Sequence, residues 1–505
     1  MDPTGKPTDT ADVIEVTAVP TTRNVARRLM GASAVYGSAN FGLRALNFLL
    51  LPFYTHYLTP TDYGIIVIAE TLALLLIKIV GSGFDAAIQR LYFQHVDQPE
   101  VLSSYVGSAL KFALVAVSAF LVLVLTAGPW LQRTFAAGFS VPFVYLAFAI
   151  STAAASQFFD YRQVLYQCER RPKTFAVLAF FSFFLTASLC VTLVVFRRMG
   201  VRGMLEGKLF AALVGFTVAL YLARRVFHSH FRWRYVRETI ALGMPLVPHQ
   251  LMALGLVAAD RFILQHYRDL REVGLYSMAY AFGNIMSLVT ISLSQAWAPV
   301  YYDLARHGDE GRRVLGRMSS GLIIVLTAIA CFGALIAQSF VARFLDVKYV
   351  SAGRVVPLII GAYLAHSAFS LFSIAALQAR RSQFLMLASI FALVLNTILN
   401  FALIPRLGMY GAAYATIIAY VMEALVMYVL SQQVFRLDYD LPRTFGAAGV
   451  FTVVLFVTQI RWSPTSPTNT WANLAAGLAA FGALVALGFD RVKLLRLGFS
   501  KPRLS

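Results

Sequence analysis

One arginine lies deep inside the first long apolar stretch of the chain. Arg44 has Asn40 and Asn47 beside it, at a spacing that places all three on one face of a helix. A guanidinium group stays ionised and binds phosphate oxygens through a fork of hydrogen bonds. We therefore predict that Arg44, Asn40 and Asn47 bind a phosphate-bearing ligand. A structural ion pair between Arg44 and Glu70 of the next apolar stretch is the alternative.

The second apolar stretch carries charges that predict coupling to an ion gradient. Glu70 lies deepest and is the candidate for binding a proton or a sodium ion, and Lys78 and Asp85 follow on one helical seam. The alternative for Lys78 and Asp85 is a simple pair near the cytoplasmic end. Arg90 comes next, either as a second headgroup ligand or as an anchor at the membrane surface.

Two later stretches predict the opposite wall of the same site. Asn284 and Gln295 share one face of a helix, where they either line a cavity or hold helices together. Arg261 follows Asp260 at the expected outer end of an earlier stretch. We expect Arg261 to be a weaker ligand contact or part of a surface pair. Pro245 near the start of that stretch predicts a kink.

The composition identifies the medium in which these residues act. Of the 505 residues, 59% are hydrophobic and 13% are charged, and the mean hydropathy is +0.69. Soluble domains carry roughly a quarter charged residues, so a soluble enzyme and a disordered chain are excluded. The net charge of +19 is assigned to loops, and no nucleic-acid partner is expected. Three isolated cysteines indicate neither disulfides nor a metal site, and no motif for covalent catalysis is present.

Fourteen apolar stretches are long enough, or nearly so, to cross a bilayer as helices. They lie near residues 31–57, 63–84, 103–128, 141–159, 174–196, 204–226, 238–259, 274–299, 318–341, 355–377, 384–404, 409–434, 445–460 and 473–489. The last two are short, so twelve spans are the alternative. Basic residues gather on alternate connections, beginning with the N-terminal segment, which predicts that both termini face the cytoplasm.

Sequence landmarks recur at a nearly constant offset. The matching pairs are Arg170–Arg171 with Arg380–Arg381, Arg198-Met-Gly200 with Arg406-Leu-Gly408, and Asp62-Tyr-Gly64 with Val273-Gly274. The repeat predicts an all-α polytopic membrane protein with two six-helix lobes around a central cavity, an architecture of alternating-access transporters. The expected parts are a cytoplasmic tail (1–30), an N-lobe (31–227), a C-lobe (228–435), two additional spans (436–490) and a basic cytoplasmic tail (491–505).

Short motifs at the starts of the predicted lobes resemble a known family. Residues 51–64, LPFYTHYLTPTDYG, and the later segments Gly243-Met-Pro245, Asp260-Arg261-Phe-Ile-Leu264 and Val273-Gly-Leu-Tyr-Ser277 are similar to those of the multidrug/oligosaccharidyl-lipid/polysaccharide flippase superfamily. Within it, the chain most resembles polysaccharide biosynthesis proteins of the O-antigen flippase branch. The resemblance covers almost the whole chain.

The resemblance implies a function, a location and partners. It implies that an undecaprenyl-diphosphate-linked oligosaccharide is moved from the cytoplasmic to the periplasmic leaflet of the bacterial inner membrane. Arg44 would meet the diphosphate, with Arg90 and Arg261 as further ligands. Membrane lipids, glycosyltransferases and a polysaccharide polymerase are the other implied partners, and no cofactor is expected beyond a proton or sodium gradient. The two extra C-terminal spans resemble those of lipid II flippases, so a peptidoglycan precursor stays an alternative substrate, and a multidrug antiporter of the same fold is another.

Overall fold

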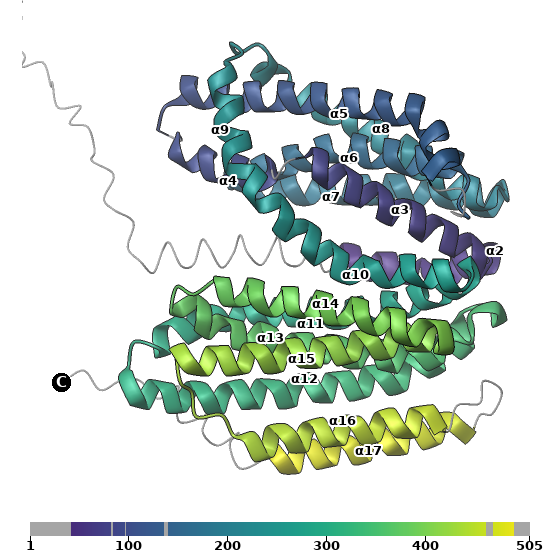
Figure 1. The fold of residues 1–505 in the computed structure, drawn as a ribbon, viewed down its shortest axis with the longest axis vertical. Coiled ribbons are helices and arrows are strands. Elements are labelled where there is room, and N and C mark those ends of the chain that lie inside the picture. The colour runs from purple at the N-terminus through teal and green to yellow at the C-terminus, as the bar shows by residue number, and fades with distance from the viewer. Residues whose placement is uncertain (1–41, 82–83, 96, 136–139, 461–467, 489–505) are drawn as a thin grey trace, which may run out of the picture.

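The computed structural model describes residues 42–81, 84–95, 97–135, 140–460 and 468–488, and every regular element in these ranges is a helix (Figure 1). Eleven helices in this part of the chain are long and apolar enough to cross a membrane. The structure thus confirms an all-α, multi-pass membrane protein. The number fourteen stays a prediction.

The helices follow one another with short connections. They are α2 (Leu51–Tyr57), α3 (Pro60–Val80), α4 (Phe84–Gln94), α5 (Pro99–Phe135), α6 (Phe143–Cys168), α7 (Pro172–Val191), η1 (Thr192–Phe196), α8 (Gly200–Phe227), α9 (Trp233–Gly243), η2 (Met244–Leu246), α10 (Val247–Tyr267), α11 (Leu270–Leu304), α12 (Gly308–Phe344), η3 (Val347–Tyr349), α13 (Ala352–Gln378), α14 (Gln383–Leu407), α15 (Met409–Val434), α16 (Leu441–Ile460) and α17 (Thr468–Gly488).

The helices form two groups (Figure 1). In the group that we call the N-lobe, α6 packs against α3, α5 and α8; in the C-lobe, α13 packs against α11, α12 and α15, and α14 against α10 and α15. Helices α16 and α17 lie on α12, outside the C-lobe. The lobes meet where α3 packs against α10 and α11. The exact domain boundaries drawn from the sequence stay predictions.

The backbone repeats the landmarks that the sequence predicts. Arg170 and Arg380 both adopt left-handed conformations, with φ of 55° and 56°, at the ends of α6 and α13. Gly200, the first residue of α8, and Gly408, directly before α15, also have positive φ angles, of 58° and 59°. Residues in this conformation are uncommon unless a tight turn requires them. Equal geometry at equivalent places supports two copies of one helical unit.

The predicted seventh span, residues 238–259, is placed about two helical turns too early, because α10 covers Val247–Tyr267. A short amphipathic helix, α9, ends at Gly243, and the 3₁₀ turn η2 contains Pro245, which redirects the chain before α10 begins at Val247. Proline interrupts the helical hydrogen-bond pattern, so a new helix starts after it. Because α10 then continues to Tyr267, Asp260 and Arg261 lie inside the helix and not at its outer end.

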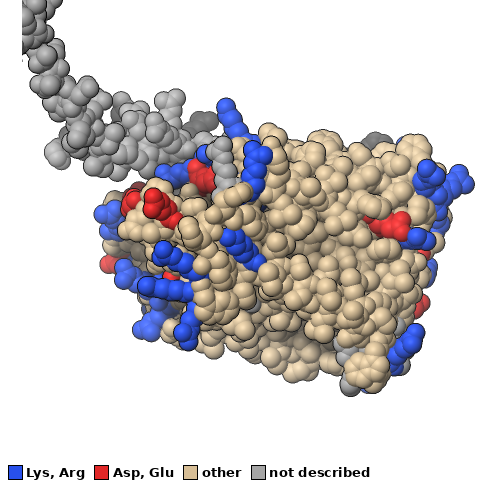
Figure 2. All heavy atoms as spheres, turned by 90° about the horizontal axis from the view of Figure 1, so that it is seen from above, with Lys and Arg blue, Asp and Glu red and all other residues tan. Residues whose placement is uncertain are grey.

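The surface of the two lobes is that of a protein surrounded by lipid. Figure 2 shows Lys and Arg side chains gathered toward two opposite ends, with a broad belt nearly free of charge between them. Large apolar side chains such as Val115 of α5, Val177 of α7 and Val453 of α16 are more than 60% exposed. In water such exposure would be unfavourable, whereas in a bilayer it is expected.

Candidate functional site

The two lobes touch where α3 and α11 begin. Both helices start with an acidic capping pattern: the Thr59 side chain accepts a hydrogen bond from the Asp62 backbone N–H, and the Asp269 side chain accepts one from Glu272 N–H at 2.8 Å. Such caps fix where a helix starts. As a result, Gly64 and Gly274 occupy the same position in the second turn of their helices.

These two glycines bring the helix backbones into direct contact. A Cβ atom on Gly64 would collide with the carbonyl oxygen of Leu270, and it would lie 3.2 Å from the Gly274 nitrogen. A Cβ atom on Gly274 would in turn collide with the carbonyl oxygen of Pro60. We call this Gly64–Gly274 contact the gate, because only residues without a side chain allow the lobes to close here.

Further bonds join the lobes at the same end. The Tyr349 hydroxyl of η3 donates to the carbonyl of Leu58 at 3.1 Å, and the Tyr349 ring packs edge-on against Tyr63. The Asp346 backbone N–H donates to the Thr55 hydroxyl at 3.4 Å. The start of α3 is thus held by backbone contact and by polar bonds to the C-lobe.

Burial along α11 shows that the contact between the lobes does not continue over the full length of the helix. Ser277 is 5% exposed and Tyr280 is 1% exposed, whereas Asn284 and Gln295, further along the helix, are exposed. On this face, α11 is therefore packed near the gate and exposed at Asn284 and Gln295. Asn284 bonds to Tyr363 of α13, on which Arg44 and Arg261 act electrostatically, and we call the region around these four residues the seam.

Arg44 faces the C-lobe across the seam. Its side chain is exposed, yet it is close enough to Tyr363 of α13 to act on that phenol electrostatically. Asn47, one helical turn later, is also exposed and donates to the Leu43 carbonyl. The alternative of an Arg44–Glu70 ion pair is wrong for this structure, because Glu70 pairs with another residue. Within the described ranges, Arg44 has no carboxylate at ion-pair distance.

Arg261 supplies a second cation from the C-lobe. Its guanidinium lies 5.0 Å from the centre of the Tyr280 ring and donates to the Val257 carbonyl, while its Nε atom is buried without a partner among the described residues. The expectation that Asp260–Arg261 is a surface pair is wrong, because Asp260 is 0% exposed. Its carboxylate accepts bonds from the hydroxyls of Tyr276 and Tyr280 instead.

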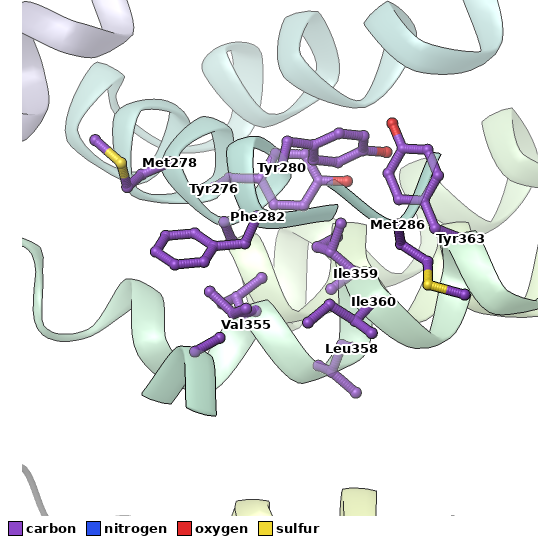
Figure 3. Close-up of a cluster of buried hydrophobic side chains, with 14 of the residues drawn as sticks. Tyr276, Met278, Tyr280, Phe282, Met286, Val355, Leu358, Ile359, Ile360 and Tyr363 are labelled. Atoms are coloured by element: carbon purple, nitrogen blue, oxygen red, sulfur yellow. The ribbon is translucent and has the colours of Figure 1, made fainter. Parts of the chain in front are cut away.

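Tyr363 connects the polar groups of both lobes. Its hydroxyl donates to Asn284 Oδ1 at 2.9 Å, and both Arg44 and Arg261 act on it electrostatically. In Figure 3, Tyr363 extends toward Tyr280, away from the aliphatic side chains around Ile359, and the two rings are 6.1 Å apart. The seam therefore holds two guanidinium groups, one from each lobe, around one phenol. Such a pair suits a ligand with two neighbouring negative charges.

Glu70 forms an ion pair inside the N-lobe. Lys208 of α8 donates a hydrogen bond to the Oε1 atom of Glu70. The Glu70 side chain is 39% exposed and the Lys208 side chain is 25% exposed. Tyr63 lies within electrostatic reach of this pair and of Arg261. Glu70 is thus balanced by a neighbouring lysine, and its predicted role in coupling stays a prediction.

Breaking this pair on one side should destabilise the protein. For Glu70→Gln or Lys208→Met alone we expect a loss of about 1–3 kcal/mol in unfolding free energy, between the values for exposed and buried pairs. The Glu70→Gln/Lys208→Met double variant should recover most of the loss, because no lone charge is left. Thermal unfolding of the purified variants in detergent measures both effects. Additive losses in the double variant would show that the pair contributes nothing.

The remaining predicted site residues are not brought together with this pair of arginines. Arg90 is exposed on α4 and has no hydrogen bond or ion pair within the described ranges. Gln295 is exposed three turns beyond Asn284 on α11. Asn40 and the side chain of Asp85 lie outside the described residues, so the Lys78–Asp85 pair stays a prediction.

The sequence reasoning missed Tyr363 and the pairing of Lys208 with Glu70. Tyr363 has no charge and lies in a long apolar stretch, so nothing in its own helix marks it. The pairing of Lys208 with Glu70 could have been predicted from their positions along the chain. Lys208 lies about as many residues from the start of α8 as Glu70 lies from the start of α3. Helices that start on the same side of a membrane bring such residues to equal depth.

Comparison with known proteins agrees with this architecture. The family model described as "Polysaccharide biosynthesis protein" matches residues 31–305. A Haemophilus influenzae protein of the Lsg locus is 19% identical over 280 residues, which cover 54% of this chain and 65% of that relative. The match thus spans slightly less than two thirds of the relative's length.

Solved structures share the fold. Lipid II flippase MurJ in an inward closed conformation has a TM-score of 0.73 at 14% identity, covering 91% of this chain and all of the other. An inward-facing multidrug resistance MATE family transporter of the MOP superfamily has a TM-score of 0.57 at 13% identity, covering 77% and 97%. A mutant of the Vibrio cholerae MATE transporter VcmN has a TM-score of 0.55 at 12% identity, covering 82% and 98%.

Proposed function

Because the chain belongs to the polysaccharide biosynthesis protein family, we propose that it flips an undecaprenyl-diphosphate-linked oligosaccharide from the cytoplasmic to the periplasmic leaflet of the bacterial inner membrane. The family and the fold are those of transporters and flippases and not of enzymes. The repeat unit of a surface polysaccharide or exopolysaccharide, such as O-antigen, is the proposed oligosaccharide.

The observation that carries the proposal is that Arg44 and Arg261, one from each lobe, both act electrostatically on Tyr363. A diphosphate is the charged part of such a lipid, and guanidinium groups hold its oxygens through charge-assisted hydrogen bonds. The exposed amides of Asn47 and Asn284 offer further donors at the same place. In the membrane core, charged side chains generally face a partner or a water-filled path.

The direction of transport follows from the gate and the predicted orientation. With both termini in the cytoplasm, α3 and α11 begin at the periplasmic face, so the gate closes that side. The seam is then accessible from the cytoplasmic side, where the lipid-linked substrate is made. Rocking of the lobes would separate Gly64 from Gly274 and release the substrate outward. A proton or sodium gradient is the proposed energy source, and glycosyltransferases and a polymerase are the proposed neighbours.

The direct test is accumulation of the lipid-linked intermediate. Deleting the gene should abolish the surface polysaccharide and leave undecaprenyl-diphosphate oligosaccharide in the cytoplasmic leaflet, where a membrane-impermeant glycosidase cannot reach it in intact spheroplasts. Reintroducing the gene should restore both. Normal surface polysaccharide in the deletion strain would contradict the proposal.

The similarity to a lipid II flippase supports a second candidate substrate, a peptidoglycan precursor. It carries the same lipid diphosphate, so the seam would bind it in the same way. Depleting the resident lipid II flippase in a host that expresses this chain separates the two candidates. Continued growth would favour the peptidoglycan precursor, and lysis would favour the oligosaccharide.

A multidrug antiporter is the third candidate, and the charge of the seam argues against it. Cationic drugs need acidic or apolar surroundings, whereas Arg44 and Arg261 repel them. Expression in a host without its own drug exporters should therefore leave the inhibitory concentrations of cationic drugs unchanged. A several-fold rise that disappears in Glu70→Gln would instead identify a drug antiporter that uses Glu70.

A further inference from the structure

A carboxylate of the C-lobe is buried with no lysine or arginine at ion-pair distance among the described residues. Glu423 of α15 is 0% exposed. One of its oxygens lies 3.0 Å from Nδ1 of His366 on α13, and the other accepts a hydrogen bond from the Ser389 hydroxyl of α14 at 2.9 Å. Three helices of the C-lobe therefore meet at this carboxylate. Within the described ranges, His366 is its one basic neighbour.

The charge of this carboxylate requires compensation. An isolated charge at membrane depth costs at least about 2.5–3.5 kcal/mol on insertion scales. Two forms avoid this cost: a protonated imidazole next to the carboxylate, or a protonated carboxyl group next to a neutral imidazole. A carboxylate next to a neutral imidazole would leave one uncompensated negative charge. Each of the two favourable forms carries one more proton, which cancels that charge. In either form, the His366–Glu423 pair therefore holds one proton between the two side chains.

The imidazole is the accessible part of this pair. The His366 side chain is 35% exposed, whereas Glu423 behind it is sealed. The ring packs against Phe369 at 5.3 Å and against Tyr420 at 4.9 Å, which fixes its orientation. His366 lies one helical turn after Tyr363, the phenol on which both seam arginines act electrostatically. Protons can therefore exchange through the exposed edge of the imidazole.

The other ionisable groups nearby are already satisfied or do not exchange protons near neutral pH. Tyr420 of α15 is the nearest of these groups, and its ring contacts His366. The groups that act electrostatically on Tyr420 are Glu423 itself and, from other helices, Tyr363, Tyr280 and Asp260. Phenols keep their protons in this range. Asp260 is bonded to two tyrosine hydroxyls. The positive groups that face this region are the seam arginines Arg44 and Arg261.

We propose that His366 and Glu423 form the proton-binding site that couples this flippase to the proton gradient. The inference rests on the proposed function and adds the residues at which the coupling ion binds. A proton fits the site better than a metal ion does, because one carboxylate and one nitrogen are too few ligands, and no larger cluster of ligating side chains occurs in the described part of the chain. Glu70, in contrast, is already paired with Lys208.

Proton binding at the pair is measurable without any transport. Histidine-selective carbon labelling of the purified full chain gives eight NMR signals, one for each histidine, and the His366 signal is the one missing in His366→Asn. We expect the wild-type signal and the Glu423→Gln signal to respond differently to pH, because the ring nitrogen loses the carboxylate that it contacts at 3.0 Å. The exposed His307 is the internal control and should not shift. Superimposable His366 curves in both proteins would overturn the proposal.

Coupling is tested in cells that export the surface polysaccharide. Nigericin, which collapses the pH gradient, should reduce export by the wild type, and export that remains in Glu423→Gln should no longer respond to it. His307→Asn should behave like the wild type. Export by Glu423→Gln that still follows the pH gradient would overturn the coupling role. If instead deletion of the gene leaves the polysaccharide intact, the proposed function fails, while the NMR titration still decides whether the pair binds a proton.

Discussion

Replacing Arg44 by alanine should reduce polysaccharide export by about a hundredfold or more while the protein still reaches the membrane in normal amounts. A hydrogen bond to a charged group is worth about 1.5–3 kcal/mol, and a guanidinium makes two such bonds to a diphosphate. The exposed position of Arg44 and its reach to Tyr363 place the loss in ligand binding and not in folding. Immunoblots of the surface polysaccharide, with an epitope tag to follow the protein, measure both quantities.

Two matched variants make this result specific. Arg44→Lys keeps the charge but loses the planar fork, so it should retain intermediate export. Arg133→Ala removes an exposed arginine at the end of α5, far along the chain from the seam, and should export normally. Full export by Arg44→Ala would remove the diphosphate role of Arg44, even if the protein proves to be a flippase.

Replacing Gly64 by valine should abolish export by preventing the gate from closing. The new Cβ atom would overlap the carbonyl oxygen of Leu270, and neither helix backbone can yield without moving a lobe. The variant should therefore favour states in which the lobes are apart at the periplasmic side. Gly274→Val should give the same result, because its Cβ atom would meet the carbonyl oxygen of Pro60.

The state of the gate can be followed by chemical labelling. A cysteine at Asn284, in a chain whose native cysteines have been replaced, should react faster with a membrane-impermeant maleimide from the periplasm when Gly64 is valine. Gly321→Val is the matched control, since a Cβ atom there meets nothing within 4 Å. Unchanged labelling together with wild-type export in Gly64→Val would show that this contact is not a gate.

Much of the architecture could be predicted from the sequence, because burial in lipid demands long apolar helices and leaves few alternatives. The repeated landmarks also predicted structural equivalence correctly: Arg170 and Arg380 share a rare backbone conformation. Gly64 and Gly274, marked only as landmarks, turn out to touch each other. The seventh span was misplaced because a hydropathy pattern does not show whether a proline kinks a helix or separates two.

The candidate site could be predicted only in part. The deep position of Arg44 in an apolar stretch marked it as functional, and the structure places it opposite the C-lobe. Its partners could not be predicted, since helical periodicity fixes which residues share a face of one helix and not how that helix is rotated against its neighbours. Arg261 seemed to lie at a helix end because the start of α10 was set too early.

The sequence by itself determined that this is a membrane protein of two repeated helical lobes with a cation deep in its first span. Only the tertiary structure decided which charges meet: Lys208 with Glu70, two tyrosines with Asp260, and His366 with Glu423. The physical reason is that the cost of a charge at membrane depth depends on side chains that approach from other helices. Those neighbours are chosen by packing, and packing joins residues that lie far apart along the chain.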